Sequence, residues 1–414
     1  MLGKSSFRKR SATLALLVFG VLLGAAWART ETVLYSFCAQ SNCVDGAYPA
    51  SGLVLDQKGN LFGTTYSGGA YGDNGGGVVF KLTPQGKQTV LYSFCAMNNC
   101  TDGVTPMAGL VLDQKGNLYG TTYFGGTHGL GVVFKLTQEG KETVLHSFCA
   151  RDNCTDGQGP LASPVFDQKR NLYGTTWSGG AYGYGTVFKV TPQGKETVVY
   201  SFCARGNRIC EDGARPLGLV FDYKGNLYGT AAGGGTHDSG VVFKLTPEGK
   251  ETVLYSFCEQ TDCTDGSRPD GAPVFDHTGN LYGTADGGTQ GYGVVFKLTP
   301  EGNETVLYSF CEQTDCTDGR EPTDGVVFDH NGNLYGTTYA GRTYDDCKGF
   351  GCGVVFKLTP KGKETVLYSF CAQNNCTDGV GTRTRVLFDQ KGNLYGTTID
   401  GGVYGSGVVF KLTP

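Results

Sequence analysis

A motif that recurs seven times constrains this chain more than any other feature. The string Thr-Val-Leu-Tyr-Ser-Phe-Cys begins at Thr32 and returns, with small changes, at Thr89, Thr143, Thr197, Thr252, Thr305 and Thr365. The cysteines that end successive copies are 53 to 60 residues apart, and the repeat fills nearly all of the chain after residue 28. A fixed period of this length is typical of propellers and solenoids, in which one small unit is used many times.

Each repeat contains four short segments that favour β-strands. In the first unit these segments are residues 52–56, 60–65, 77–83 and 89–94, rich in β-branched and aromatic residues and joined by connections containing Gly and Pro. Both alternating sets of the fourth segment are substantially apolar, so both faces of the sheet must be covered. Sheets packed face to face around an axis meet that requirement.

The sequence therefore predicts an all-β fold, a seven-bladed β-propeller of four-stranded antiparallel blades spanning residues 29–414. The last unit lacks a fourth strand, and we expect the N-terminal strand 32–37 to join it and close the ring, which leaves no open sheet edge. A linear β-solenoid is the alternative. The predicted blades are approximately 52–94, 109–148, 163–202, 217–257, 272–310, 325–370, and 385–413 together with 32–37.

The strings Val-Leu-Tyr-Ser-Phe, Asp-x-x-Gly-Asn-Leu-Tyr-Gly-Thr-Thr and Gly-Val-Val-Phe-Lys-Leu-Thr-Pro resemble the GloVer (Gloeobacter/Verrucomicrobia-type) tandem repeat. The resemblance covers nearly the whole chain after residue 28. It implies an exported bacterial repeat protein with a propeller-like fold, and it implies no particular activity.

Residues 1–28 have the pattern of a secretory signal peptide. A basic start (Lys4, Arg8, Lys9 and Arg10) precedes an apolar run, and Ala26-Trp27-Ala28 offers a small-x-small cleavage site. An uncleaved membrane anchor is the alternative. Cleavage predicts a secreted, periplasmic or cell-surface protein without a transmembrane segment. It also removes four basic groups from a chain of net charge −4, and an acidic surface without a basic stripe excludes nucleic acid as a partner.

The sixteen cysteines form eight local pairs, and an even count behind a signal peptide predicts disulfides. Zinc or iron–sulfur ligation is the competing interpretation, but it requires pairs that converge, whereas a propeller spreads them around its rim. The predicted pairs are Cys38–Cys43, Cys95–Cys100, Cys149–Cys154, Cys203–Cys210, Cys258–Cys263, Cys311–Cys316, Cys347–Cys352 and Cys371–Cys376.

One face of the ring is predicted to bind a ligand. The second-to-third loops and blade-to-blade links share a face and hold nearly all differences between the repeats, whereas the turns of the opposite face are short and uniform. Rings among these glycines suit a polysaccharide or protein partner, although packing between blades is the plainer interpretation. The candidates are Tyr71, Tyr123, His128, Trp177, Tyr182, His237, Tyr292, Tyr344 and Tyr404.

Three functions remain open from the sequence: a binding module, a carboxylate-dependent glycoside hydrolase or lyase, and a purely structural envelope protein. No nucleophile motif or cofactor motif is present, so we expect no cofactor and favour a protein that is not an enzyme. Carboxylates for the hydrolase could come from Asp238, Asp286 and Asp400. Weak calcium candidates are Asp262, Asp265, Asp315 and Asp318.

Overall fold

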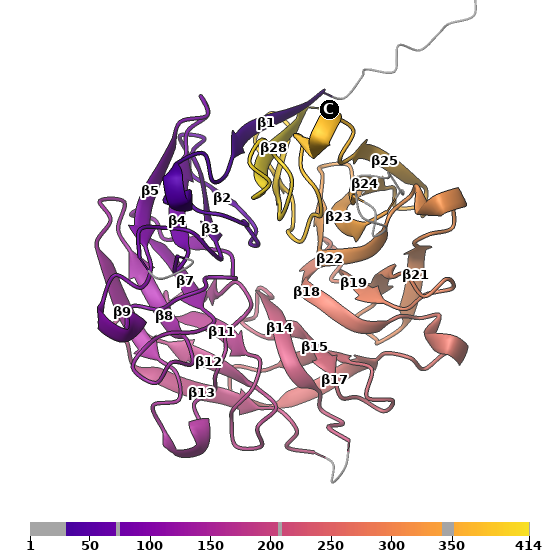
Figure 1. Cartoon of the computed structure of the whole chain (residues 1–414). Coiled ribbons are helices and arrows are strands. Elements are labelled where there is room, and N and C mark those ends of the chain that lie inside the picture. Colours follow the sequence, from indigo (N-terminus) through magenta and orange to yellow (C-terminus); the bar gives the residue numbers. More distant parts are fainter. Residues whose placement is uncertain (1–29, 72–74, 206–208, 342–351, 414) are drawn as a thin grey trace, which may run out of the picture.

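The computed structural model describes residues 30–71, 75–205, 209–341 and 352–413, so the predicted signal peptide lies outside the described residues. Seven four-stranded antiparallel sheets form a closed ring (Figure 1). In each sheet the strands follow one another from the ring axis outward, and the sheets are numbered here as blades 1 to 7 in chain order. The predicted seven-bladed β-propeller is confirmed, and the solenoid is wrong.

The strands have the following bounds. Blade 1 contains β2 (Val54–Leu55), β3 (Leu61–Thr65), β4 (Val78–Leu82) and β5 (Gln88–Ser93). Blade 2 contains β6 (Val111–Leu112), β7 (Leu118–Thr122), β8 (Val132–Leu136) and β9 (Glu142–Ser147), and blade 3 contains β10 (Val165–Phe166), β11 (Leu172–Thr176), β12 (Thr186–Val190) and β13 (Glu196–Ser201). Blade 4 contains β14 (Ala214–Phe221), β15 (Leu227–Gly233), β16 (Val241–Leu245) and β17 (Glu251–Ser256).

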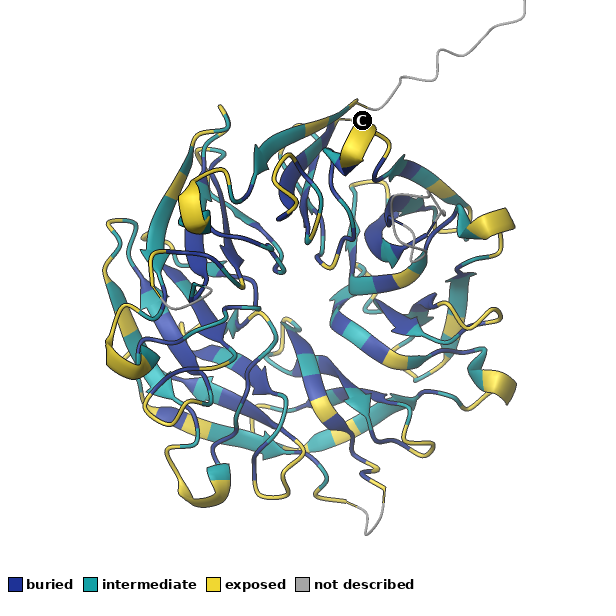
Figure 2. Ribbon diagram, viewed as in Figure 1, coloured by how far each residue is buried: buried dark blue, intermediate teal, exposed yellow. Residues whose placement is uncertain are grey.

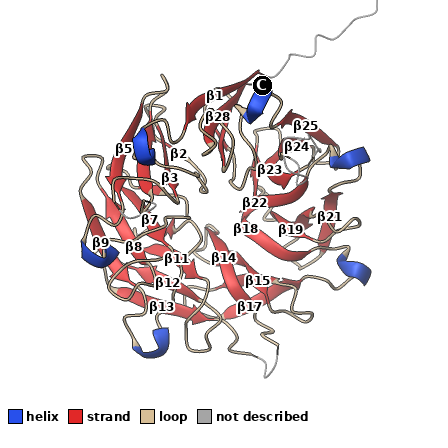
Figure 3. Ribbon diagram, viewed as in Figure 1, coloured by secondary structure: helices blue, strands red, loops and turns tan. Residues whose placement is uncertain are grey.

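The remaining blades follow the same order. Blade 5 contains β18 (Ser267–Phe275), β19 (Leu281–Asp286), β20 (Val294–Leu298) and β21 (Glu304–Ser309), and blade 6 contains β22 (Arg320–Phe328), β23 (Leu334–Ala340), β24 (Val354–Leu358) and β25 (Glu364–Ser369). Blade 7 contains β26 (Leu387–Phe388), β27 (Leu394–Thr398), β28 (Val408–Thr413) and β1 (Thr30–Ser36). One-turn 3₁₀ helices lie near the outer edge (Figure 3): η1 (Ser41–Cys43), η2 (Asn98–Cys100), η3 (Asp152–Cys154), η4 (Thr261–Cys263), η5 (Thr314–Cys316) and η7 (Asn374–Cys376).

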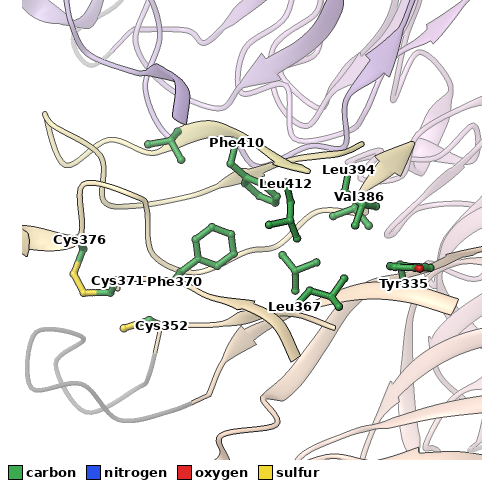
Figure 4. Packing of buried hydrophobic residues seen from close by; sticks show 12 residues of the cluster. Tyr335, Cys352, Leu367, Phe370, Cys371, Cys376, Val386, Leu394, Phe410 and Leu412 are labelled. Carbon is green, nitrogen blue, oxygen red and sulfur yellow. A yellow bond between two sulfur atoms is a disulfide. The ribbon is translucent and has the colours of Figure 1, made fainter. Parts of the chain in front are cut away.

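The hydrophobic core lies between the blades, where both sheet faces are apolar (Figure 2). At every junction a buried phenylalanine that follows one outermost strand packs edge-on against a phenylalanine in the third strand of the next blade. Phe370 and Phe410 are such a pair, with ring centroids 5.0 Å apart (Figure 4). The pair repeats at all seven junctions with centroid distances of 5.0–5.1 Å. Edge-to-face packing of this kind adds to the stability gained by burial.

The N-terminal strand closes the ring as predicted. β1 pairs antiparallel with β28, from Thr30 opposite Thr413 to Ser36 opposite Val408. Backbone pairing between the two ends of the chain therefore completes blade 7 and removes the open edge that β28 would otherwise present.

The innermost strands differ from the prediction in blades 4 to 6. We expected these blades to begin at residues 217, 272 and 325, but their first strands begin at Ala214, Ser267 and Arg320. The reason is that the residues before the predicted first strand already pair with the second strand of the blade, for example Arg320 with Ala340. A bulge then separates these pairs from the predicted ones. The extra residues bring several charged side chains close to the ring axis.

Candidate functional site

The short turns form a uniform face. In blade 1, Oδ1 of Asp56 accepts hydrogen bonds from the backbone N–H groups of Lys58 (2.9 Å) and Asn60 (2.8 Å), and its Oδ2 accepts one from the Asn60 side chain. The same bonds recur in the other six blades. The carboxylate of each of these aspartates makes these hydrogen bonds to residues of its own turn, so its role is to stabilise a tight hairpin turn. Most of the differences between blades lie on the opposite, long-loop face.

Disulfides close the loops that follow the outermost strands. Seven of the predicted pairs are formed: Cys38–Cys43, Cys95–Cys100, Cys149–Cys154, Cys203–Cys210, Cys258–Cys263, Cys311–Cys316 and Cys371–Cys376. Cys352 is also disulfide-bonded, while Cys347, its predicted partner, lies outside the described residues. Such bridges persist in oxidising compartments.

A buried aspartate organises each of these loops. Asp45 is fully buried, and its carboxylate accepts hydrogen bonds from Tyr35 Oη (2.7 Å) and from the backbone N–H groups of Ala39 (2.9 Å) and Gln40 (3.1 Å). The other six loops repeat this arrangement, with His146 in place of the tyrosine in one of them. These aspartates shape the loops and are not arranged to act on a ligand.

The predicted calcium candidates occupy two of these loops. Asp265 and Asp318 are the buried aspartates just described, engaged by Tyr255 (2.7 Å) and Tyr308 (2.8 Å) respectively. Asp262 and Asp315 are exposed residues of η4 and η5 with positive φ. Within the described ranges, no three His, Cys, Asp or Glu side chains gather as metal ligands would.

Five of the nine candidate rings lie at the exposed tips of the second-to-third loops, away from the innermost strands: Tyr71, His128, Tyr182, His237 and Tyr404. His237 has local partners, with Nδ1 3.1 Å from Thr236 Oγ1 and 3.7 Å from Glu259 Oε1. Tyr344 lies outside the described residues. The eight rings that the structure describes are thus not brought together into one cluster.

The three predicted carboxylates are also separate. Asp238 has a positive φ of 53° and accepts a hydrogen bond from the backbone N–H of Gly234 (2.9 Å), which is a loop-capping role. Asp400 pairs through its backbone with Val380 on the same blade. Asp286 forms an ion pair with Arg268 at 3.0 Å.

The inner rim of the long-loop face is built from a repeated backbone feature. Just after the disulfide loop of each blade, one residue has φ between 44° and 68° and donates its backbone N–H to the preceding blade. For Arg215 this bond goes to the Tyr184 carbonyl at 2.8 Å. Left-handed backbone is uncommon outside glycine, so these positions are tightly determined. They are Tyr48, Thr105, Gly159, Arg215, Arg268, Glu321 and Gly381.

Side chains at the inner rim stack across blade junctions. The guanidinium of Arg215 lies 5.5 Å from the ring centroid of Trp177 in the preceding blade. Arg320 lies 5.6 Å from the Tyr292 ring, and the guanidinium of Arg383 lies 4.3 Å from the ring of Tyr339. Cation–π contacts of this kind contribute about 0.5–2 kcal/mol each. They fix both the rings and the guanidinium groups in place.

Aromatic rings occupy the other side of the inner rim. Tyr48 and Tyr66 of blade 1 have ring centroids 5.5 Å apart, and Tyr66 is exposed. Tyr123 of blade 2 lies against Gly159 of blade 3, where a Cβ would come within 2.9 Å of the tyrosine ring. The inner rim therefore has an aromatic half on blades 1 to 3 and an arginine-rich half on blades 4 to 7.

Three charged residues lie deeper, next to the ring axis. Arg385 of blade 7 donates hydrogen bonds from Nε to the Asp324 carbonyl of blade 6 (3.0 Å) and from Nη2 to the Ala272 carbonyl of blade 5. The backbone N–H of Arg385 donates to Oδ2 of Asp324 (3.0 Å), and the backbone N–H of Asp324 lies 3.5 Å from Oδ2 of Asp270. We call Asp270, Asp324 and Arg385 the axis cluster.

The electrostatics of the axis cluster are perturbed. Burial raises the pKa of Asp270 to about 6, and repulsion from Asp324 and Asp286 adds to the shift. Burial also raises the pKa of Asp324, opposed by Arg385. For Asp286 at the rim, burial raises the pKa, and Arg268 opposes the shift. Perturbed carboxyls concentrate at functional sites, although ion-pair networks in a scaffold produce the same effect.

Comparisons with known proteins bear on this arrangement. The Gloeobacter/Verrucomicrobia repeat matches residues 18–163, 72–286 and 259–414, which together span most of the sequence. The chain belongs to this repeat family. The predicted resemblance is thereby confirmed. No curated protein sequence matches the chain.

Solved structures show the same fold at low identity. The extracellular domain of a two-component hybrid system, BT3049 from B. thetaiotaomicron, is 15% identical with a TM-score of 0.55, over 93% of this chain and 41% of that one. The extracellular domain assigned to a one-component system, BT4673 from the same organism, is 10% identical with a TM-score of 0.54, over 92% and 40%. The repeat-family chain therefore spans about two fifths of the length of these structures, and the likeness shows the fold alone.

Some residues of this repeat-family member were not predicted from the sequence, namely the axis cluster and the stacked arginines. A signal for one of them was present, because Arg385 stands where four other repeats carry Gly52, Gly109, Gly218 and Gly325. A charged residue in one repeat, at a position where most other repeats have glycine, is not needed to form the blade and therefore indicates a separate role. The three stacked arginines also lack counterparts in most repeats.

Two further observations complete the description of the repeat-family chain. A cleft of about 180 Å³ opens on the short-turn face between blades 2 and 3, lined by residues including Asp113, Tyr119 and Arg170. It is smaller than ordinary ligand pockets, and most of its lining residues recur at equivalent positions in the other blades. In the part of the chain that the structure describes, no helix has the length and apolar character needed to cross a membrane.

Proposed function

We propose that this protein is an exported binding module and that the inner rim of its long-loop face binds a polysaccharide. One observation carries the proposal: the strands and short turns are nearly identical between repeats, but at the inner rim the repeats differ and collect aromatic rings and arginines held in fixed positions. A rigid scaffold that presents variable side chains around one opening is the usual layout of a binding site.

Export is supported by three independent features. Residues 1–28 have the signal-peptide pattern, the disulfides persist in an oxidising compartment, and two solved structures with the same fold are extracellular domains. A partner outside the cytoplasm, either in the envelope or beyond it, follows from this location.

A sugar polymer suits the aromatic half of the inner rim. Tyr66 is exposed, and Trp177 is fixed by Arg215, so these rings lose little conformational freedom when a ligand binds. Rigid, partly exposed rings stack on the apolar faces of pyranose units. A protein partner would use the same rings, and a protein-overlay assay with the same variants distinguishes the two.

The test is a glycan array followed by calorimetry with the full chain. We expect Trp177→Ala to weaken binding about tenfold, the effect of losing roughly 1.4 kcal/mol. Tyr223→Ala is the matched control, because Tyr223 is a highly exposed ring on the short-turn face. Binding that is lost in the Tyr223 variant and kept in the Trp177 variant would contradict the proposal.

The axis cluster favours a second candidate, a carboxylate-dependent glycoside hydrolase or lyase. Asp270 and Asp324 are adjacent, and the raised pKa of Asp270, about 6, is the property expected of a general acid. This candidate predicts that bound polymer is cut and that Asp270→Asn abolishes cutting. Binding without the release of new reducing ends or unsaturated products, measured over days, would contradict it.

A further inference from the structure

We propose that the ligand of the inner rim is an acidic polysaccharide, whose carboxylate or sulfate groups are held by arginines at four consecutive blade junctions. This inference rests on the proposed function and specifies the chemical class of its ligand. The four residues are Arg215, Arg268, Arg320 and Arg383.

The four arginines follow one another around half of the ring. Arg215 reaches from blade 4 to Trp177 of blade 3, and Arg383 reaches from blade 7 to Tyr339 of blade 6. Between them, the backbone of Arg268 in blade 5 bonds to blade 4, and Arg320 of blade 6 stacks on a ring of blade 5. The result is an arc of guanidinium groups with one group per blade junction.

This concentration of arginine is not a property of the whole surface. The described residues contain eight arginines, and five of them lie at the inner rim or in the axis cluster. The other three have separate roles: Arg151 and Arg205 pair with glutamates at the outer edge, and Arg170 contacts Gln114 on the short-turn face. The chain as a whole has a net charge of −4, so the arc gathers arginines on one part of an acidic chain.

Two arginines of the arc, Arg215 and Arg383, form no ion pair with the described residues. Asp286 pairs with Arg268, Glu321 is exposed next to Arg320, and Asp400 occupies in blade 7 the position that Asp286 has in blade 5. Deeper down, Asp324 is engaged by the backbone of Arg385. The guanidinium groups of Arg215 and Arg383 are therefore available to an anionic ligand at the rim.

The stacked geometry suits anions of a particular shape. When a guanidinium lies over an aromatic ring, its planar N–H edge remains available for two parallel hydrogen bonds to a carboxylate or sulfate. Arg215 and Arg383 are both exposed and both stacked in this way. A lysine ammonium would provide a point charge without this directional pair of donors.

The aromatic half of the inner rim distinguishes an acidic polysaccharide from other polyanions. Uronic acid units present a sugar face to rings such as Tyr66 and a carboxylate to the arginines. A nucleic acid carries a much denser line of charge, which the acidic remainder of the surface repels. Both halves of the rim are then used by a single ligand.

The experiment is isothermal titration of the full chain with polygalacturonate, with neutral pullulan as the comparison. We expect binding of polygalacturonate only, and we expect the affinity to fall at least tenfold when NaCl rises from 50 to 500 mM. Arg383→Gln and Arg215→Gln should each weaken binding about tenfold, and Arg383→Lys should restore only part of it. Arg170→Gln on the short-turn face is the matched control and should bind normally, and melting temperatures confirm that each variant is folded.

The outcomes separate the inference from the function beneath it. Equal, salt-insensitive binding of pullulan that depends on Trp177 but not on Arg383 would overturn the acidic ligand and leave the binding module intact. Tighter binding of single-stranded oligonucleotide than of polygalacturonate would overturn the polysaccharide class. Failure of folded protein to bind any polymer on the array or in titration would overturn both proposals.

Discussion

Arg385 shows how one residue can alter a symmetric scaffold. Its equivalents in four other blades are glycines, and a side chain at Gly325 would meet its guanidinium at 3.1 Å. The arginine therefore fits because its neighbours around the axis are small. It links blade 7 to blades 5 and 6 through backbone carbonyls, which are contacts that no other described repeat makes in the same way.

We expect Arg385→Ala to lower the free energy of unfolding by about 3 kcal/mol, since two hydrogen bonds from a charged donor are lost and two carbonyls lose a partner. Chemical denaturation monitored by tryptophan fluorescence measures the change. Arg383→Ala is the control, because Arg383 is exposed at the rim and should affect ligand binding more than stability. Equal stability of the Arg385 variant and the parent would show that the axis contacts contribute nothing.

At the scale of the strand, the outermost element of nearly every blade places a glutamate at the junction with the preceding blade. Glu196 and Glu251 are paired there with Arg151 and Arg205. Glu142 and Glu304 are different, because neither carboxylate oxygen has a hydrogen-bond partner among the described residues. Burial raises the pKa of Glu142 to about 7 and that of Glu304 to about 8, and the nearby Asp102 and Asp265 respectively add to the shifts.

This geometry predicts that the protein is more stable in mild acid than at pH 8. A carboxyl whose pKa is raised on folding stabilises the fold fully below its unfolded pKa of about 4.5, and this contribution is lost as pH rises through 7 to 8. Asp102 and Tyr92 face Glu142, while Asp265 and Tyr255 face Glu304, so the nearby titrating groups are acids.

Blade 1 already carries the neutral version of this junction, with Gln88 at the equivalent position. We therefore expect Glu142→Gln with Glu304→Gln to raise stability at pH 8 by about 1–2 kcal/mol per site, reduced from the full pKa shift because the side chains keep some contact with solvent. Melting temperatures between pH 4 and pH 9 test this. Glu139→Gln, in an exposed turn, is the control, and a double variant with the parent's pH profile would refute the prediction.

For the whole molecule, closure of the ring depends on pairing between β1 and β28. Deleting residues 30–36 would expose the edge of β28, so we expect a fall in melting temperature of about 10 °C or more and association through the open edge. Size-exclusion chromatography and calorimetry measure both effects. A circular permutant that carries residues 30–36 after Thr413 is the control and should melt close to the parent, whereas a deletion variant that stays monomeric and equally stable would contradict this account of closure.

The sequence predicted the architecture well because the architecture is repetitive. Seven copies of one alternating pattern determine the strands, the phenylalanine pairs and the closing strand. In each copy both faces of the sheet are apolar and must be covered by the neighbouring blades. The disulfide pairs followed from local spacing in the same way. The longer first strands of blades 4 to 6 were not predicted, because each contains a bulge, such as the one that follows Asp270. A bulge interrupts the alternation of hydrophobic and polar residues from which strands are predicted.

The site was harder to predict than the fold. The long-loop face was identified as the variable face, and Trp177 and Tyr292 do lie among the stacked residues of the inner rim. Contacts between Arg383 and Tyr339, or between Arg385 and blade 5, depend on how neighbouring blades approach the axis. A single sequence shows which residues break the repeat, but the distances between blades come only from the folded ring.

The central claim, that the inner rim of the long-loop face is where the ligand binds, is tested most directly by hydrogen–deuterium exchange of the full chain with and without polygalacturonate. We predict slower exchange in the segments that contain Tyr48, Tyr66, Trp177, Arg215 and Arg383, and unchanged exchange in the short turns at residues 56–60, 113–117 and 222–226. Protection confined to those short turns would contradict the account and place the ligand on the opposite face of the ring.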